Sequence, residues 1–521
     1  MHGYFSLVLH THQPYVRKNG VFPVGEDWLY QVMADTYLPL LEMLAQLEHE
    51  GLTSCLAVTM TPVLCEQLAD PYVKERFIEY LRVMAEHAGS DTRDFEYFSD
   101  EKRKALGEAY RDDYRRKRLA YLAIDGDLLG ALEAFEEGGL IEVISSSATH
   151  AFLPGFADPR GVEHQVRLGI DSHRRHFGCD PAGFWIPECA YSVGLENLLE
   201  SEGVRYMLID GTALPNGLPS TYAYLAGSSH VSAIARSERA HRNVWDEVSG
   251  YPTDGAYIDS TKYYHSSGLY YWRVTGLDVP IENKEVYEPK AAQRRALEHA
   301  RHFIDEVTEE LVSSPPPAAA ASGNATPLPI VLASYDTELF GHFWREGPYW
   351  LEVTLRSLAQ CEGLVLTTPF VYLTENASAA GTSLKETTWG TNRDHSTWLN
   401  ESTAWMWDEL CRAQNKLFEL SSLRGQGEHY DRALAQAVRE ILLLESSDWP
   451  YMVAKDRAKE YSIERFTAHS ERFRRITGAL ERGEPEQLGP ELAEIEESDN
   501  IFQQIDLDTV FGSGDAFGGR K

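Results

Sequence analysis

Cysteine and positive charge are scarce in this 521-residue sequence. The six cysteines are scattered, and no two of them form a C-x-x-C pair. This spacing argues against a disulfide framework and against a cysteine-based zinc site. Lysine and arginine number 48 against 80 aspartates and glutamates, which gives a formal net charge of -32. Because that charge repels phosphate backbones and anionic lipids, we expect no nucleic acid and no membrane as partner.

Long apolar segments and leader-like features are also lacking. No run approaches 18 apolar residues, and the N-terminus shows no basic stretch followed by an apolar core. We therefore expect neither a transmembrane helix nor a secretory leader. Together with the scattered cysteines, these features predict a cytoplasmic protein. No feature of the sequence indicates the oligomeric state.

Aromatic residues, in contrast, are plentiful. The sequence contains 11 tryptophans and 27 tyrosines, many of them in polar surroundings. Sugar rings have apolar faces that pack on such side chains, which combine an aromatic body with a polar group. A neutral sugar is not repelled by an acidic protein. The composition therefore favours a neutral carbohydrate as the ligand.

Several short β-prone runs end in a histidine or a carboxylate. The runs cover residues 4–9, 141–144, 184–187, 206–209 and 330–333. The polar residues that follow them are, in order, His10 and His12, His150, Glu188, Asp210 and Asp336. Parallel strands that alternate with helices form a βα barrel, whose active site lies at the carboxyl ends of its strands. The repetition predicts such a barrel, with these side chains around its site.

The stretch from Ile330 to Trp344 shows the pattern most completely. Its first four residues are apolar, as in a strand buried on both faces. It then continues into Asp336, Glu338 and His342, which suit a site better than a core. The alternative is that Asp336 caps a helix and that Glu338 and His342 are solvated.

Glu188 and the first two histidines each allow more than one interpretation. Glu188 is either desolvated and reactive or an acid near a helix N-terminus. His10 and His12 share one face of a strand, as metal ligands or as hydrogen-bonding groups over a pocket would. The alternative is that both histidines lie in a loop, where their ring nitrogens are hydrogen-bonded and have no functional role. A catalytic zinc requires a third ligand, and none is evident nearby. A zinc-dependent hydrolase or deacetylase that uses His10 and His12 is therefore kept only as an alternative hypothesis.

Composition divides the chain into two main regions. We predict a catalytic barrel over residues 1–380 and a helical C-terminal domain over 381–510. Residues 215–290 lack helical periodicity, which predicts an excursion that lines the cleft. The Pro- and Ala-rich residues 313–329 are typical of a flexible linker, and residues 511–521 of a disordered tail.

Both the excursion and the C-terminal domain contribute candidate binding residues. Arg236 and Trp272 lie in the excursion, and Trp398, Trp407 and Asp448 lie in the C-terminal domain. So many aromatic and acidic side chains are unusual on a plain helical surface, which favours a place in the cleft. The alternative is that the tryptophans belong to a core, since tryptophan is usually highly buried.

Five segments carry a family resemblance. They read L-H-T-H-Q-P-Y, A-T-H-A-F-L-P, G-F-W-I-P-E-C-A-Y, S-Y-D-T-E-L-F-G-H-F-W and L-L-L-E-S-S-D-W-P. In this order they resemble glycoside hydrolase family 57, and within it most closely the α-glucan branching enzymes. The similarity runs over roughly residues 4–508. Such a combination is specific, whereas any one motif alone is not.

The resemblance implies an α/β fold, an incomplete (β/α)7 barrel with an inserted small domain and a C-terminal helical domain that closes the cleft. It implies retaining chemistry on an α-1,4-glucan such as amylose, glycogen or starch, without a metal or cofactor. Glu188 would be the nucleophile and Asp336 the general acid/base. The candidate substrate-binding residues are His10, His12, His150, Trp272, Trp398, Trp407 and Asp448, together with Asp210 and Arg236. Retaining enzymes keep their two carboxyls about 5–5.5 Å apart, which two strand ends of one barrel allow.

Branching and hydrolysis differ in what attacks the glycosyl-enzyme. Branching enzymes of the family carry a long loop with a tyrosine after the strand that ends here at Asp210. In this sequence residues 211–221 are short and contain no tyrosine. We expect a branching enzyme, with a mainly hydrolytic amylase-like enzyme as the alternative and Tyr222 or Tyr224 as substitutes for the missing group. The non-enzymatic alternative is a glucan-binding protein, against which the presence of both Glu188 and Asp336 speaks.

Overall fold

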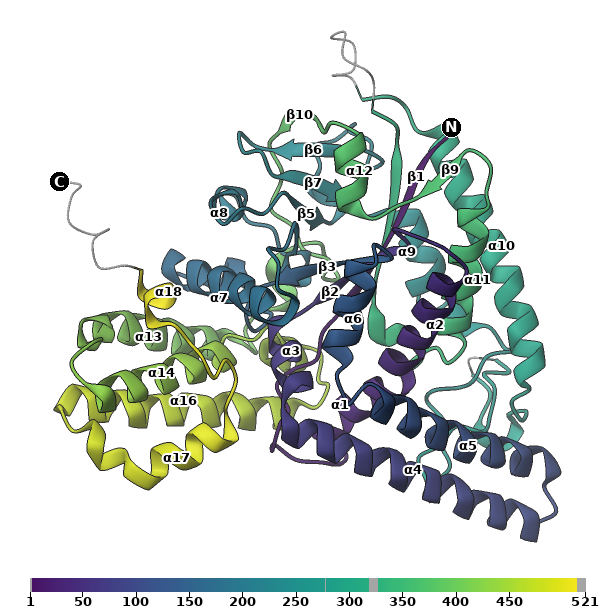
Figure 1. Ribbon diagram of the computed structural model, residues 1–521, viewed down its shortest axis with the longest axis horizontal. Helices are drawn as coiled ribbons and strands as arrows, with labels where there is room; N and C mark the ends of the chain where they lie inside the picture. The colour runs from purple at the N-terminus through teal and green to yellow at the C-terminus, as the bar shows by residue number, and fades with distance from the viewer. Residues whose placement is uncertain (1, 277, 318–326, 513–521) are drawn as a thin grey trace.

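The computed structural model of the protein describes residues 2–276, 278–317 and 327–512 (Figure 1). Much of the predicted linker 313–329 lies outside the described residues, as does the predicted tail 511–521 apart from its first two residues. Among the described residues, no helix is both long enough and apolar enough to cross a membrane.

A ten-stranded sheet forms the centre of the molecule. Its order is β10-β6-β7-β5-β4-β3-β2-β1-β8, and β9 pairs with β1. The strands are β1 Gly3–Thr11, β2 Leu56–Met60, β3 Ile141–Ser146, β4 Gly183–Trp185, β5 Tyr206–Ile209, β6 Ala223–Ala226, β7 Ser232–Ala235, β8 Ile330–Asp336, β9 Leu364–Leu366 and β10 Ala379–Thr382.

Seven strands of this sheet run parallel in succession, from β8 through β1, β2, β3, β4 and β5 to β7. Strand β1 is buried along its whole length, as its apolar sequence predicts for a parallel strand covered on both faces. The first and last strands of this series, β8 and β7, approach each other. The backbone N–H of Ser237, just after β7, donates to the carbonyl of Leu332 in β8 at 2.7 Å. The predicted incomplete (β/α)7 barrel is confirmed.

Helices surround the sheet, and the chain then leaves it for a separate group of helices. The barrel region contains α1 Glu26–Val32, α2 Leu38–His49, α3 Pro62–Ala69, α4 Pro71–Tyr97, α5 Glu101–Ala123, α6 Leu128–Glu137, α7 Pro159–Phe177, α8 Leu195–Ser201, α9 Glu238–Trp245, α10 Pro289–Ser313, α11 Gly347–Ala359 and α12 Pro369–Glu375. The C-terminal group contains α13 Ala404–Glu419, α14 Glu428–Leu444, α15 Asp448–Ala454, α16 Lys459–Arg482, α17 Gly489–Ser498 and α18 Leu507–Phe511. Figure 1 shows α13, α14, α16 and α17 gathered on one side of the molecule, and α4 and α5 as a long hairpin.

The C-terminal helices share a hydrophobic core with the barrel. Leu434 and Ile441 of α14 are fully buried in a cluster that also contains Tyr15 and Leu168 from the barrel region. The Tyr15 hydroxyl donates to the carbonyl of Ser498 at 3.1 Å. Removing this apolar surface from water fixes the C-terminal group against the carboxyl ends of the strands.

The structure corrects the predicted boundaries of the excursion. Residues 215–290 were expected to leave the barrel, but β6 and β7 belong to the sheet, with β7 parallel to β5 and β6 antiparallel to β7. The irregular part begins only after α9 and contains mainly short 3-10 turns such as Tyr251–Thr253. The prediction failed because four-residue strands rich in alanine and serine carry little alternation between apolar and polar positions.

Candidate active site

A cavity of about 460 Å³ opens at the carboxyl ends of the barrel strands. It is lined from the barrel side by His10, His12, His150, Glu188, Arg236, Asp336 and Glu338, and from the C-terminal side by Trp389, Trp398, Asp448 and Tyr451. Segments far apart in the sequence therefore meet at one site. Most of the predicted site residues are among them, and Asp210, Trp272 and Trp407 are not.

Three residues that line the cavity, Glu188, His150 and Arg393, adopt left-handed backbone conformations. Glu188, which follows β4, has φ 59°, and His150, which follows β3, has φ 55°. Non-glycine residues rarely adopt such angles, and they persist where surrounding contacts hold them. The sharp turns after these two short strands direct both side chains into the site.

Glu188 accepts hydrogen bonds at both carboxylate oxygens. The indole N–H of Trp389 donates to Oε2 and the hydroxyl of Ser447 donates to Oε1, both at 2.8 Å. Burial raises the pKa of Glu188 to about 7, and the hydrogen bonds from Trp389 and Ser447 oppose that rise. A carboxylate held by two donors keeps an ionised form accessible inside a desolvated site.

Ser447 extends this contact into a chain of hydrogen bonds. Its Oγ lies 3.0 Å from Nδ1 of His150, and Nε2 of His150 lies 3.0 Å from Nε2 of His10. If Ser447 donates to an ionised Glu188, it must accept from His150 Nδ1–H, and His150 Nε2 must accept from His10 Nε2–H. Burial lowers the pKa of both histidines well below the usual value, so both rings are neutral.

The environment of His10, at the end of this series of hydrogen bonds, agrees with that direction of donation. Nδ1 of His10 is buried and has no hydrogen-bond partner among the described residues. If His10 donates from Nε2, its Nδ1 carries no proton. A buried acceptor without a partner is less unusual than a buried N–H without one. The geometry thus assigns the tautomers of both histidines.

Asp336 ends β8 directly opposite His10 of β1. Its removal from water raises its pKa to about 8, and the charges of Glu338 and Glu188 add to the rise. Glu338 accepts a 2.7 Å hydrogen bond from Tyr37, and burial raises its pKa to about 7. Because Glu188, Asp336 and Glu338 face one cavity, which Glu247 and Asp448 also line, mutual repulsion disfavours ionisation of all three at neutral pH.

His12 and Asp448 connect the barrel to the C-terminal helices. His12 Nε2 lies 3.0 Å from Oδ2 of Asp448, and its Nδ1 lies 3.1 Å from the hydroxyl of Thr61. Burial lowers the pKa of His12, but the charge and hydrogen bond of Asp448 outweigh it, and the pKa is raised. Burial alone would raise the pKa of Asp448, but the charge and hydrogen bond of His12 have the larger effect, so the pKa of Asp448 is lowered. The pair thus favours a protonated His12 beside an ionised Asp448.

Asp210 lies beneath the cavity and does not line it. It is fully buried and accepts from Nε of Arg236 at 2.9 Å, and Nη2 of Arg236 lies 2.7 Å from the same oxygen. Arg393 also pairs with it. The guanidinium of Arg236 in turn lies 5.7 Å from the centre of the Trp389 ring. Asp210 therefore acts on the site by orienting the two arginines that do line it.

The predicted tryptophans occupy three different environments. Trp398 lines the cavity and stacks on Phe152 with ring centres 4.8 Å apart. Trp407 lies behind it, where its indole N–H donates to the Trp398 carbonyl at 2.9 Å. Trp272 lies outside the cavity lining, with the guanidinium of Arg103 5.6 Å from its ring centre. The prediction that Trp407 and Trp272 line the cleft is corrected, because sequence spacing reveals neither which face of α13 meets the barrel nor how the irregular segment around Trp272 folds.

Sequence reasoning missed several residues of the site and misplaced two tyrosines. Trp389, Ser447 and Tyr451 were not predicted. Ser447 is adjacent to Asp448, and Tyr451 follows one helical turn later, so the motif that contains Asp448 carried a usable signal. Tyr222 and Tyr224 are buried in the core beside the sheet and do not line the cavity.

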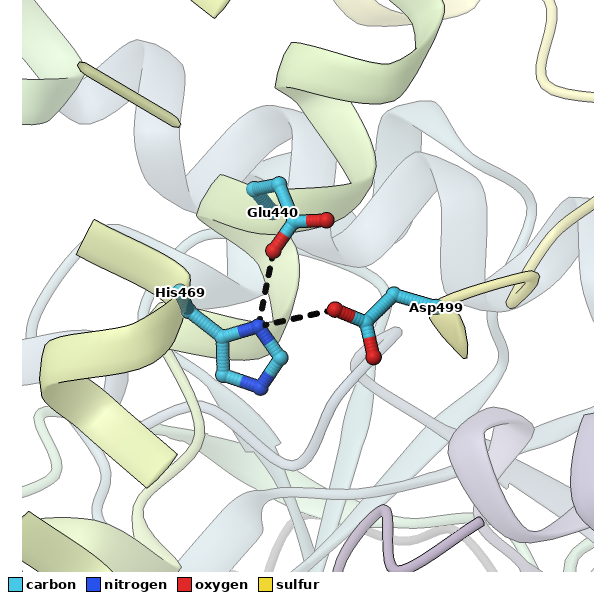
Figure 2. A group of neighbouring side chains, drawn as sticks. All are labelled: Glu440, His469 and Asp499. Carbon is cyan, nitrogen blue, oxygen red and sulfur yellow. Dashed lines mark hydrogen bonds and ion pairs between the residues drawn. The ribbon is translucent and has the colours of Figure 1, made fainter. Parts of the chain in front are cut away.

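The histidines of the cavity do not belong to the cluster best suited to a metal. Within the described residues, the group of three or more possible ligands is Glu440, His469 and Asp499 in the C-terminal helices (Figure 2). His469 Nδ1 lies 2.8 Å from Glu440, while its Nε2 accepts from Arg465 at 2.8 Å. Because Arg465 only donates, the ring proton must sit on Nδ1, the atom that a metal would need. The cluster is a buried hydrogen-bonded ion network that joins α14, α16 and the segment after α17.

Known proteins resemble this chain along almost its whole length. The family model of glycosyl hydrolase family 57 matches residues 6–307, and that of the 1,4-alpha-glucan branching enzyme C-terminal region matches residues 409–510. The 1,4-alpha-glucan branching enzyme of Thermococcus kodakarensis is 36% identical, over 97% of this chain and 78% of that protein. The crystal structure of a GH57-type branching enzyme from Pyrococcus horikoshii has a TM-score of 0.90 at 36% identity and covers 98% of this chain and 97% of its own.

An alpha-amylase from Thermotoga maritima has the same fold. Its crystal structure gives a TM-score of 0.87 at 24% identity and covers 98% of this chain and 100% of its own. At that identity the likeness concerns the fold alone. The match of the family model over more than half of the sequence and the identity to the Thermococcus protein, however, decide the family: the chain belongs to glycosyl hydrolase family 57.

Proposed function

We propose that the protein is a 1,4-alpha-glucan branching enzyme. It cleaves an α-1,4 bond of an amylose-, glycogen- or starch-like glucan through a covalent glycosyl-enzyme and transfers the chain to a 6-hydroxyl. The observation that carries the proposal is the presence of Glu188 and Asp336 on one desolvated cavity, in a chain whose relatives at 34–36% identity are branching enzymes. The six unpaired cysteines suit the reducing cytoplasm.

The different surroundings of the two carboxyls support their roles. Glu188 receives two hydrogen bonds that favour its ionised form, which suits the nucleophile. Among the described residues, no side chain donates a hydrogen bond to Asp336, whose higher pKa of about 8 suits the general acid. Environments that push two carboxyl pKa values apart are the usual basis for such a division of roles.

The other lining groups provide sugar contacts. His12 and Arg236 carry hydrogen-bond donors at the cavity, while Trp389 and Trp398 offer aromatic faces to pyranose rings. These roles require no metal and no cofactor. The proposed mechanism therefore rests on the side chains of this protein alone.

Ser447→Ala is expected to shift the acid limb of the pH–kcat/KM profile for glucan turnover upward by roughly one pH unit. A hydrogen bond to the charged form lowers the pKa of an acid, so its loss raises the pKa of Glu188 and reduces the ionised fraction. Ser462→Ala is the matched control, because this buried serine donates to the carbonyl of Trp449 and not to Glu188. An unshifted acid limb in Ser447→Ala would show that Ser447 does not set the ionisation of Glu188.

The short segment after Asp210 favours some hydrolysis beside transfer. It contains a single 3-10 turn, Gly211–Ala213, and the tyrosines that follow it are buried. Water is present at roughly 55 M, so an acceptor sugar competes only if the site holds it in the attacking orientation. Without a covering loop, part of that advantage is lost.

Incubation with amylose tests both the proposed function and its alternative. We expect new α-1,6 linkages together with measurable release of reducing ends. Replacing residues 211–221 with a longer loop that bears a tyrosine should raise the ratio of branching to hydrolysis. Reducing ends without new α-1,6 linkages would favour the amylase-like alternative, whereas branching with negligible hydrolysis would contradict the role given to the short segment.

A further inference from the structure

A second cavity, of about 670 Å³, lies outside the active site. Its walls are the segment from Val21 to Asp35, which includes α1, the middle of α4, Tyr114 of α5, and the segment from Tyr263 to Tyr270. Six aromatic residues contribute to these walls, namely Phe22, Tyr30, Tyr80, Tyr114, Tyr263 and Tyr270. None of them has a role in the proposed chemistry.

The aromatic residues of this groove differ in exposure: Tyr30 and Tyr114 are buried, whereas Phe22 and Tyr263 are exposed at the rim. The rings of Tyr30 and Tyr80 lie 5.8 Å apart with 39° between their planes, and α1 and α4 hold them in place. At the rim, Phe22 is 79% exposed and Tyr263 is 55% exposed. Large aromatic faces exposed beside a concave surface are typical of a binding site.

Polar groups alternate with the aromatic ones in the same walls. Gln31 donates to Asp27 at 2.6 Å, and both line the groove. Arg76 and His87 also line it, and among the described residues no carboxylate pairs with Arg76. Both donors and acceptors are therefore available, as a ligand rich in hydroxyl groups requires. The net charge of -32 disfavours an anionic ligand.

The groove shares a wall with the active-site cavity. Asp35 lines the groove, and the next residue, Thr36, accepts a hydrogen bond at its hydroxyl from the backbone N–H of His342 at 3.2 Å. Phe343, which follows His342, lines the active-site cavity and is 55% exposed. Tyr37 donates to Glu338 inside that cavity. One contiguous piece of structure thus separates the two openings.

We propose that this groove is a second binding site for an α-glucan chain, which holds polymeric substrate beside the active site. The exposed rings of Phe22 and Tyr263 pack against pyranose faces, and the polar groups bind hydroxyls. The identity of the sugar rests on the proposed function, whereas the position of the groove beside the active site follows from the shared wall. A polymer held there raises the effective concentration of chain ends and branches at the active-site cavity.

Affinity electrophoresis in gels that contain amylopectin tests this proposal. Glu188→Gln serves as the parent, so that the polymer is not consumed. In that background, Phe22→Ala with Tyr263→Ala is expected to raise the apparent Kd for amylopectin about tenfold. The matched control is Tyr97→Ala with Phe98→Ala, two aromatic residues that are 83% and 72% exposed and do not line the groove. All four side chains are exposed, so we expect unfolding temperatures close to that of the parent.

The results distinguish the groove from the proposed function. An unchanged Kd in the groove variant, or an equal loss in the control variant, would overturn the groove as a glucan site. Formation of α-1,6 linkages from amylose is measured separately on the unmodified protein. Its absence together with a selective loss of amylopectin binding in the groove variant would overturn the branching activity and leave the glucan site supported.

Discussion

Glu188→Gln is expected to lower kcat on amylose by at least about 10⁴-fold while leaving glucan binding in place. The substitution keeps the shape of the side chain and removes the negative charge that attacks the anomeric carbon. Ser447 and Trp389 donate to different oxygens of Glu188, so in the amide one of these two donors faces an NH2 group and loses its acceptor. Turnover and binding are measured in parallel, by α-1,6 linkage formation and by affinity electrophoresis.

Glu142→Gln is the matched control for this experiment. Burial also raises the pKa of Glu142 to about 7, and its carboxylate also accepts two hydrogen bonds, from Tyr206 at 2.6 Å and from the backbone of Phe370 at 3.1 Å. It lies near the start of β3, away from the cavity lining. We expect the control to retain activity at temperatures where it is folded. Activity close to that of the wild type in Glu188→Gln would remove the proposed mechanism.

Asp336→Asn is expected to lower kcat/KM on amylose by about 10²- to 10⁴-fold, the contribution of a general acid. The loss should be much smaller on aryl glucosides with activated leaving groups, because these depart without protonation. Equal losses on both kinds of substrate would contradict the assignment of Asp336 as the acid. The comparison is made on kcat/KM, because this parameter includes the step in which the leaving group departs.

The same two carboxyls determine the expected pH dependence. Glu188 must be ionised and Asp336 protonated, so activity falls as the pH drops below about 7 and as it rises above about 8. Since the two groups interact, the two limbs report the pair and not each residue separately. In Asp336→Asn the basic limb should disappear, whereas the acid limb should stay in place, because Asp336 is already neutral at the pH where Glu188 titrates. A basic limb that survives in this variant would indicate another acid.

Sequence reasoning succeeded where a strand ended in a polar group. Parallel strands of one barrel bring their carboxyl ends together, so His10, His150, Glu188 and Asp336 were predictable as neighbours before any coordinates. The chain order of the motifs also identified the family, which the comparisons confirm. For these residues, local pattern and general topology contain enough information.

The misplaced residues lie where local pattern carries little information. Trp272 and Trp407 look no different in sequence from Trp389 and Trp398, because all four stand in stretches without clear strand periodicity. The cavity receives Trp389 and Trp398 because the chain returns to the barrel between β10 and α13. No spacing rule describes such a return.

The sequence by itself determined the barrel, the two candidate catalytic carboxyls and the acidic, aromatic character that favours a neutral sugar. Only the tertiary structure decided that Ser447 and Trp389 hold Glu188, and that the second aromatic groove adjoins the active site. The physical reason is the range of the interactions concerned. Strand formation depends on neighbours along the chain, whereas the donors to Glu188 lie 201 and 259 residues away and reach it only when the C-terminal helices pack against the barrel.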